Sequence, residues 1–190
     1  MKTTSQPIRE DLEVPFNQAY WVRPALVLAG CYPGSEDSSQ TRRQLKGLVD
    51  SGIRHVVNLM EPGERNRFGH LFVPYEDQIQ SIAANTQCSL SFDPMPIKDG
   101  WVPSRIQMSR ILDSIDGSVE ANRPLYVHCL GGLGRTGTVV GCYLARHGVA
   151  SGHNVIKMIR DLRRNTLTHY LNSPETNQQM DLVESWVEAE

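Results

Sequence analysis

The sequence lacks both a long hydrophobic run and an excess of charge of one sign. Its 190 residues carry 19 Lys and Arg against 21 Asp and Glu, which gives a formal net charge of −2. This balance provides no general attraction for nucleic acid or for an anionic membrane. No apolar stretch approaches the roughly 20 residues that cross a bilayer, and segment 1–11 has no apolar core like that of a secretory signal. We therefore expect a cytoplasmic protein that binds neither nucleic acid nor membranes.

Cysteine is also scarce. The four cysteines, Cys31, Cys88, Cys129 and Cys142, include no Cys-x-x-Cys pair. Their scatter argues against a disulfide framework and against a zinc ribbon. The histidines show no pair at the i, i+4 spacing of a helical metal site. We predict no metal and no cofactor, and we expect reduced thiols that include a reactive one.

Strand patterns and helix patterns alternate along the chain. Short apolar runs predict strands at 26–29, 55–59, 89–92 and 125–127, and helical spacing predicts helices at 39–51, 76–85, 104–115, 136–146 and 155–164. A last helix is expected to begin with Ser173 as N-cap and Pro174 at its first position. The alternation indicates an α/β fold with a central, mostly parallel sheet flanked by helices. We predict one domain over 15–190, preceded by a flexible arm at 1–14.

The strongest chemical signal lies between the strand at 125–127 and the helix at 136–146. The loop reads His128-Cys129-Leu130-Gly131-Gly132-Leu133-Gly134-Arg135-Thr136-Gly137. Its glycines allow backbone N–H groups to converge, and the helix start adds its dipole, so the loop is suited to an oxyanion. The same field favours the thiolate form of Cys129. The guanidinium of Arg135 offers paired donors that match two phosphate oxygens.

This loop resembles the signature loop of protein tyrosine phosphatases and dual-specificity phosphatases: His128-Cys129, five intervening residues, then Arg135-Thr136-Gly137. The resemblance implies a compact phosphatase in which Cys129 attacks phosphorus and Arg135 binds the phosphoryl group. It also implies that the Thr136 hydroxyl supports the thiolate as leaving group and that His128 influences the ionisation of Cys129. The implied substrate-binding residues are Leu130, Gly131, Gly132, Leu133, Gly134 and Arg135.

Hydrolysis of a phosphate monoester also needs an acid that protonates the leaving oxygen. Asp99 is our candidate, because Gly100 beside it can act as a hinge and Trp101 as a bulky lid residue. The segment 96–103 is similar to the general-acid loop of small dual-specificity phosphatases, which implies that Asp99 acts as acid and later as base. An ordinary turn Asp before Gly is the competing interpretation. Asp93 and Asp113 are weaker alternatives.

A phosphocysteine must then be hydrolysed by a water molecule. The stretch 173–179 resembles the family's late segment, in which a Gln near the start of the last helix serves this step. The resemblance implies this role for Gln179, with Gln178 as a substitute. An ordinary amide on the helix surface explains Gln179 equally well.

Two other functions fit the same residues. The run 132–137 also matches the Gly-x-Gly-x-x-Gly of a dinucleotide-binding oxidoreductase, but that fold needs a second strand ending in an acid, and the sequence at 155–158 has a helical pattern. A catalytically inactive phosphate-binding module requires only that the lid is misplaced.

The substrate is inferred from the variable positions of the loop. Family members that act on phosphoinositides tend to carry lysines there, whereas this chain has Leu130 and Leu133, which disfavours a lipid. The run 65–68 resembles in letters the recognition loop of tyrosine-specific domains, but it carries Phe68 in place of Tyr, so we interpret it as a surface basic cluster. We expect a phosphorylated protein or peptide, with phosphotyrosine first and phosphoserine or phosphothreonine second. The resemblance also implies inhibition by phosphate mimics such as vanadate.

Overall fold

The computed structural model describes residues 12–66 and 68–187. The predicted arm at 1–14 therefore lies almost wholly outside the described residues. Residues 12–14 form neither helix nor strand, and the carbonyl of Glu13 accepts a hydrogen bond of 3.3 Å from Trp21 Nε1.

A five-stranded sheet forms the centre of the protein, in the order β1-β2-β5-β3-β4. The strands are β1 (Ala19–Arg23), β2 (Val27–Gly30), β5 (Leu125–His128), β3 (His55–Asn58) and β4 (Ser91–Pro94). Only β1 runs antiparallel to its neighbour, which confirms the prediction of a mostly parallel sheet. The sequence reading missed β1, because its five residues show no clean alternation of apolar and polar side chains.

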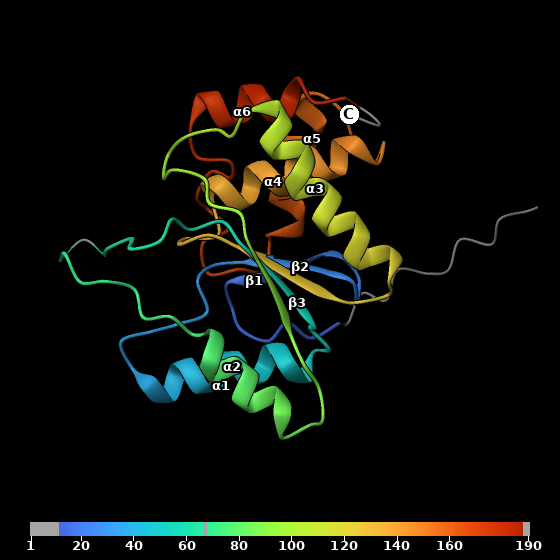
Figure 1. The fold of residues 1–190 in the computed structure, drawn as a ribbon. Coiled ribbons are helices and arrows are strands. Elements are labelled where there is room, and N and C mark those ends of the chain that lie inside the picture. The colour runs from blue at the N-terminus through green and yellow to red at the C-terminus, as the bar shows by residue number, and fades with distance from the viewer. Residues whose placement is uncertain (1–11, 67, 188–190) are drawn as a thin grey trace, which may run out of the picture.

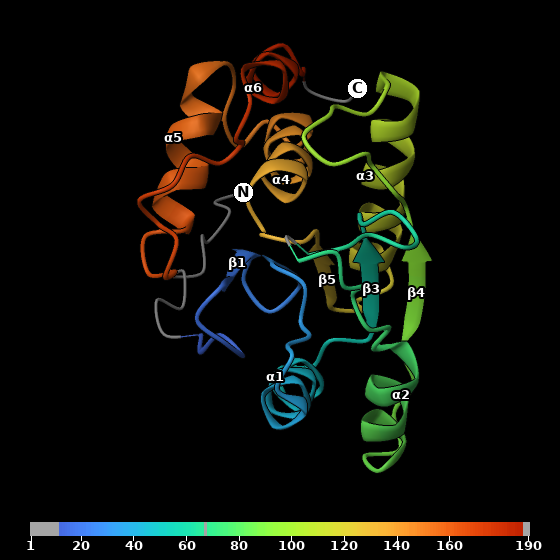
Figure 2. The same cartoon turned by 90° about the vertical axis from the view of Figure 1, so that its left-hand side faces the viewer.

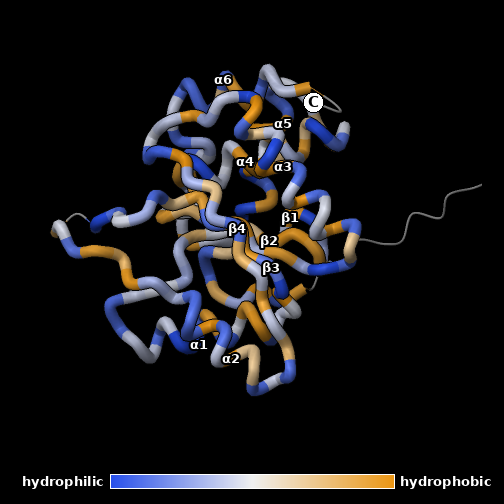
Figure 3. The backbone as a smooth tube through the Cα atoms, viewed as in Figure 1, coloured by the Kyte–Doolittle hydropathy of each residue, from blue (hydrophilic) through white to orange (hydrophobic). Residues whose placement is uncertain are grey.

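Helices cover both faces of the sheet (Figure 1). On one face lie α1 (Ser38–Asp50) and α2 (Glu76–Ala84), and on the other lie α3 (Arg105–Glu120), α4 (Gly134–Arg146), α5 (His153–Leu162) and α6 (Asn177–Glu184). Two apolar clusters result, because successive strand residues point to opposite faces: Val57 and Val127 pack under α3 and α4, and Val56 and Tyr126 pack under α1 and α2. Figure 3 shows apolar colour along the strands between the helical layers.

The last helix begins later than predicted. Its N-cap is Thr176, whose side chain accepts from the N–H of Gln179 while the Gln179 side chain accepts from the cap N–H, a capping box. The prediction that Ser173 caps the helix is wrong, because the Ser173 hydroxyl donates a 2.9 Å hydrogen bond to the Leu133 carbonyl instead. A tertiary contact therefore takes the hydroxyl that the sequence pattern assigned to the cap.

Parallel strands bring their carboxyl ends to one edge of the sheet, where ligands bind in open α/β folds. The loops after β2, β3, β4 and β5 gather at that edge, and the loop after β3 projects furthest from the body of the protein (Figure 1, Figure 2). Among the described residues, no helix has both the length and the apolar character needed to cross a bilayer.

Candidate active site

The glycine-rich loop joins the end of β5 at His128 to the start of α4 at Gly134, and it holds Cys129 almost fully inside the protein, 3% exposed. Gly132 has a φ of +70°, in the left-handed region. A Cβ atom there would lie 2.6 Å from the carbonyl carbon of Gly30, so only glycine allows the loop to pack this closely on the end of β2. The neighbouring strand therefore fixes the position of Cys129.

The first turn of α4 faces this loop. The first N–H groups of a helix have no partner within the helix, and they favour an anion in front of them. A Cβ atom on Gly134 would lie 2.5 Å from Glu175 Oε2 and 3.1 Å from Gln179 Nε2, so the segment before α6 packs tightly on this turn. The loop is thus held from two sides.

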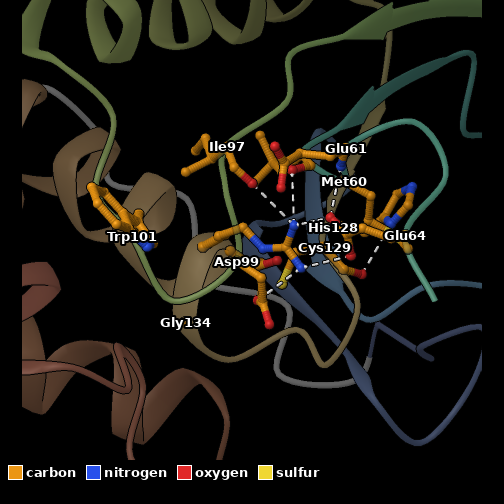
Figure 4. Close-up of polar contacts among 12 residues, drawn as sticks. Met60, Glu61, Glu64, Ile97, Asp99, Trp101, His128, Cys129 and Gly134 are labelled. Carbon is orange, nitrogen blue, oxygen red and sulfur yellow. Dashed lines mark hydrogen bonds and ion pairs between the residues drawn. The ribbon is translucent and has the colours of Figure 1, made fainter. Parts of the chain in front are cut away.

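Arg135 is the most highly connected side chain of the site, and it is 1% exposed. Its Nη1 donates to the carbonyls of Leu59 (3.3 Å) and Ile97 (3.1 Å) and to Glu64 Oε1, and its Nη2 lies 3.1 Å from Glu64 Oε2 and 3.0 Å from Asp99 Oδ1. Figure 4 shows Glu64, Ile97 and Asp99, three of these partners, grouped together with Cys129 among them. Among the described residues, Nε has no hydrogen-bond partner.

The charge on Arg135 is firmly held. Burial by itself lowers the pKa of Arg135, but the hydrogen bond that Arg135 donates to Glu64 and the charges of Cys129, Glu64 and Asp99 outweigh burial, and the pKa is raised. The side chain is therefore a permanent cation with one donor, Nε, still to be used.

Glu64 was missed by the sequence reading. It lies in the loop after β3, 71 residues before Arg135, and its side chain is 12% exposed. One carboxylate oxygen also accepts from the N–H of Glu61 at 2.7 Å. The interpretation of 65–68 as a surface basic cluster gave no sign that the same loop supplies the carboxylate next to Arg135. Arg67 itself lies outside the described residues.

His128 is fully buried and neutral. Its Nδ1 lies 3.1 Å from the Cys129 carbonyl, which can only accept, so Nδ1 carries the proton and Nε2 accepts from the Tyr75 hydroxyl at 2.5 Å. The ring stacks on Tyr126 with centroids 5.4 Å apart. Burial lowers the pKa of His128 to about 4, against the opposing effect of the hydrogen bond to the carbonyl.

This pKa predicts a specific dependence of stability on pH. Between pH 6.5, the ordinary value for an unfolded chain, and about 4, the unfolded state binds a proton at His128 that the folded state does not. Stability is therefore complete above this window and falls as the pH drops through it, by up to about 3 kcal/mol. Urea unfolding at several pH values should show a steeper loss for the native chain than for His128→Gln. The exposed His153→Gln variant is the control, and parallel loss in all three would contradict the prediction.

Asp99 lies at the mouth of the site. Its side chain is 71% exposed, and the ion pair with Arg135 holds it beside the loop of Cys129. Gly100 has a φ of +73°, and the Lys98 ammonium lies 4.4 Å from the centre of the Trp101 ring. The structure thus brings Asp99 to the site, on a segment with a glycine turn.

Gln179 lies inside the site, whereas Gln178 is exposed. The Gln179 Nε2 donates to the Trp101 carbonyl at 3.2 Å, and Oε1 accepts from the N–H groups of Glu175 (3.1 Å) and Thr176 (3.2 Å). Gln179 therefore links the Asp99 loop to the start of α6. The interpretation as an ordinary surface amide is wrong, because the side chain is fully buried.

Two more residues complete the surroundings of Cys129. The Thr136 hydroxyl donates to the Gly30 carbonyl at 3.3 Å, so its predicted role toward the sulfur stays a prediction. The Cys31 thiol lies beside the loop, where burial and the charge of Cys129 raise the pKa of Cys31 to about 12. Cys31 is thus a neutral thiol close to Cys129.

Comparison with known proteins agrees with this geometry. A family model described as "Tc-R-P: Polymorphic toxin system, DSP-PTPase phosphatase" matches residues 32–149, more than half of the chain. The chain is 27% identical to phosphatidylglycerophosphate phosphatase PTPMT1 of Arabidopsis thaliana, over 84% of this chain and 42% of that protein. It is 37% identical to dual specificity protein phosphatase CDC14AB of Danio rerio, over 83% of this chain and 24% of that protein. The chain thus spans less than half the length of these relatives.

Solved structures share the fold. Tk-PTP in its active form superposes with a TM-score of 0.63 at 24% identity, covering 89% of this chain and 95% of the other. Kinase associated phosphatase with its catalytic site cysteine substituted by serine gives a TM-score of 0.62 at 19% identity, covering 87% and 90%.

The fold and the loop around Cys129 define a compact, dual-specificity-like member of the protein tyrosine phosphatase superfamily. Within it, the chain belongs to the family described as DSP-PTPase phosphatase of polymorphic toxin systems. The dinucleotide-binding interpretation of 132–137 is therefore set aside.

Proposed function

We propose that the protein hydrolyses phosphate monoesters on proteins, phosphotyrosine first, through a phosphocysteine at Cys129. The observation that supports this most is the convergence on Arg135: a buried guanidinium, aligned by Glu64 and Asp99, lies beside a buried cysteine in the loop between β5 and α4. A phosphoryl group on the loop would meet the N–H groups of the first turn and the unused Nε of Arg135.

The reaction follows from this arrangement. The Cys129 thiolate attacks phosphorus and forms the P–S bond while the P–O bond to the leaving group breaks, and Asp99 gives its proton to the departing oxygen. A water that donates its proton to Asp99 then attacks phosphorus, the P–S bond breaks, and the thiolate and phosphate are released. Arg135 and the loop amides hold the charge that builds up on the phosphoryl oxygens in both steps.

Depth and charge support a phosphotyrosine substrate. Cys129 is 3% exposed, so the phosphate must approach a buried sulfur atom, which a long aromatic side chain allows more easily than the short side chain of serine. Leu130 and Leu133 add no positive charge, and Glu64 and Asp99 add negative charge, so a single phosphate is favoured over a multiply phosphorylated headgroup. We also infer action in a reducing, cytoplasmic compartment, because the chemistry requires a free thiol.

The test is phosphate release, in EDTA with reductant, from a phosphotyrosine peptide, para-nitrophenyl phosphate and a lipid phosphate monoester in zwitterionic vesicles. We expect metal-independent turnover that vanadate inhibits, with the peptide preferred. A higher kcat/KM on the lipid would overturn the proposal that the substrate is a protein but would leave the phosphatase activity in place. The name of the Arabidopsis relative gives a lipid phosphate as the substrate of that relative. Tight binding of phosphopeptide without turnover would favour a binding module.

Asp99→Ala should make the rate depend strongly on the leaving group. Protonation matters most for poor leaving groups, so we expect about a 100-fold loss on phenyl phosphate and a much smaller loss on para-nitrophenyl phosphate. A plot of log kcat against leaving-group pKa measures the effect. Asp113→Ala, on the surface of α3 and paired with Arg146, is the matched control. Equal losses on both substrates would move the acid role elsewhere.

Glu64→Gln should weaken phosphate binding by misaligning Arg135. Gln keeps one acceptor but loses the charge of the paired contact, so we expect kcat/KM to fall about 10-fold to 100-fold and vanadate to inhibit less well. Glu61→Gln, whose side chain is exposed in the same loop, is the control. A Glu64→Gln variant that loses thermal stability but keeps its vanadate affinity would show a purely structural role.

A further inference from the structure

An apolar cavity, called here the side cavity, lies next to the catalytic loop and has no part in the chemistry above. It has a volume of about 730 Å³ and lies between the loop after β2, the loop after β3 and the catalytic loop. Its apolar lining comes from Tyr32, Phe68, Leu71, Phe72, Val73 and Leu130. Both size and lining are typical of a preformed binding site.

The position of the side cavity shows which part of a substrate can enter it. Leu130 lines it, whereas the neighbouring Cys129 and the phosphate-binding Arg135 do not. The cavity therefore lies beside the phosphate position and not over it. The part of a bound substrate that enters the cavity is therefore not its phosphate but a neighbouring part of the molecule.

The walls are held in place by contacts between the loops. The Tyr32 hydroxyl donates to the Val73 carbonyl at 2.5 Å, and the Tyr32 ring meets the Phe72 ring edge-on at 5.2 Å. The Tyr32 N–H also donates to the Leu130 carbonyl at 3.0 Å, and this bond ties the cavity to the catalytic loop. The cavity and the loop therefore share one scaffold.

Exposed apolar side chains form the rim. Phe68 is 66% exposed, Leu71 54% and Val73 69%, and they lie on the loop after β3 that projects from the body of the protein. Figure 3 shows apolar colour along this loop. Apolar groups that gather at one place on a surface mark a contact with another molecule.

Charge at the side cavity favours a protein over an anionic membrane. Glu36 lines the cavity, is exposed, and accepts from Asn66 Nδ2 at 3.3 Å. Arg65 in the loop after β3 donates to the Gly69 carbonyl at 2.7 Å. Anionic lipid headgroups would be repelled by the Glu36 carboxylate, whereas an uncharged apolar side chain of a peptide would not be.

We propose that the side cavity binds a large apolar side chain, Leu, Met or Phe, close to the phosphorylated residue of a protein substrate. This rests on the proposed protein phosphatase function and adds a sequence preference to it. An extended peptide places neighbouring side chains about 3.3 Å apart along its axis, so one of the first two residues on either side of the phosphotyrosine can reach Leu130 and the rim.

The test is a set of phosphotyrosine peptides with Leu or Ser at each of those positions. We expect Leu at one position to raise kcat/KM about 10-fold, as burial of one such side chain provides. Leu71→Ser and Val73→Ser should reduce this preference toward equality, and both keep the Tyr32 bond to the Val73 backbone. Val149→Ser, 52% exposed at the far end of α4 and about 20 Å from the loop, should keep the preference and the basal activity.

The outcomes separate this inference from the proposed function. If para-nitrophenyl phosphate and all the peptides are turned over but Leu is not preferred to Ser at any position, the role of the side cavity is overturned and the proposed function stands. Lipid phosphate turnover that exceeds every peptide and falls in Leu71→Ser would also overturn it, because an acyl chain would then be the occupant. If no substrate is turned over, the affinity of the peptides for Cys129→Ser is measured by fluorescence anisotropy. Tighter binding of the Leu peptides that is lost when Leu71→Ser is added supports the proposed role of the side cavity, and equal binding of the Leu and Ser peptides overturns it.

Discussion

Cys129→Ser is expected to remove turnover, by a factor on the order of 10⁴ or more, and to leave phosphate binding in place. A serine hydroxyl is not ionised near neutral pH, so the loop loses its nucleophile. The groups that bind the phosphoryl oxygens, Arg135 and the first turn of α4, are unchanged, because the exchange of sulfur for oxygen alters the volume little. Binding and chemistry should therefore separate in this one variant.

The measurement has two parts. Phosphate release from para-nitrophenyl phosphate and from a phosphotyrosine peptide reports chemistry, and retention of the same peptide with competition by vanadate reports binding. Cys88→Ser is the matched control, since Cys88 is a half-buried thiol outside the site that donates to the Thr86 carbonyl at 3.4 Å. Substantial turnover by Cys129→Ser would contradict the phosphocysteine mechanism, and loss of binding and turnover together would show that the substitution damaged the loop.

The part of the fold that follows from local patterns was predictable. Apolar runs such as 55–59 and 125–127 predict buried strands because each residue there is covered by a helical layer, and the structure places β3 and β5 at these runs. The loop at 128–137 was predictable for a related reason: strand, glycines and helix start form one continuous local unit.

The part that depends on contacts across long sequence separations was not predictable. Nothing in the residues around Glu64 indicates that its carboxylate meets a guanidinium 71 positions later. The prediction of where α6 begins was wrong for the same reason. Ser173 fits an N-cap by its sequence pattern, but its hydroxyl donates a hydrogen bond to the carbonyl of Leu133, 40 positions away. Gln179 was identified by resemblance, whereas its bond to the Trp101 carbonyl needs the assembled site.

Arg135→Lys is expected to lower kcat/KM by about 10²-fold to 10³-fold with little change in the position of the nucleophile. Lysine keeps the positive charge but presents one nitrogen at the end of a flexible stem. It cannot serve the carbonyls of Leu59 and Ile97, both oxygens of Glu64 and a phosphoryl oxygen at once. The loss should therefore exceed that of Glu64→Gln, which disturbs the alignment of Arg135 but keeps the guanidinium.

Arg163→Lys provides the control that makes this result specific. Arg163 is also a buried arginine, 2% exposed, and it donates to the carbonyls of Leu171 (3.0 Å) and Thr168 (2.8 Å), two residues outside the catalytic loop. Its replacement should cost about 1–3 kcal/mol of unfolding free energy through unpaired carbonyls and leave vanadate affinity unchanged. Equal effects of the two variants on kcat/KM would mean that Arg135 acts through stability alone. A selective loss of vanadate affinity in Arg135→Lys would instead mean that the planar fork of the guanidinium, and not its charge, is what the site requires.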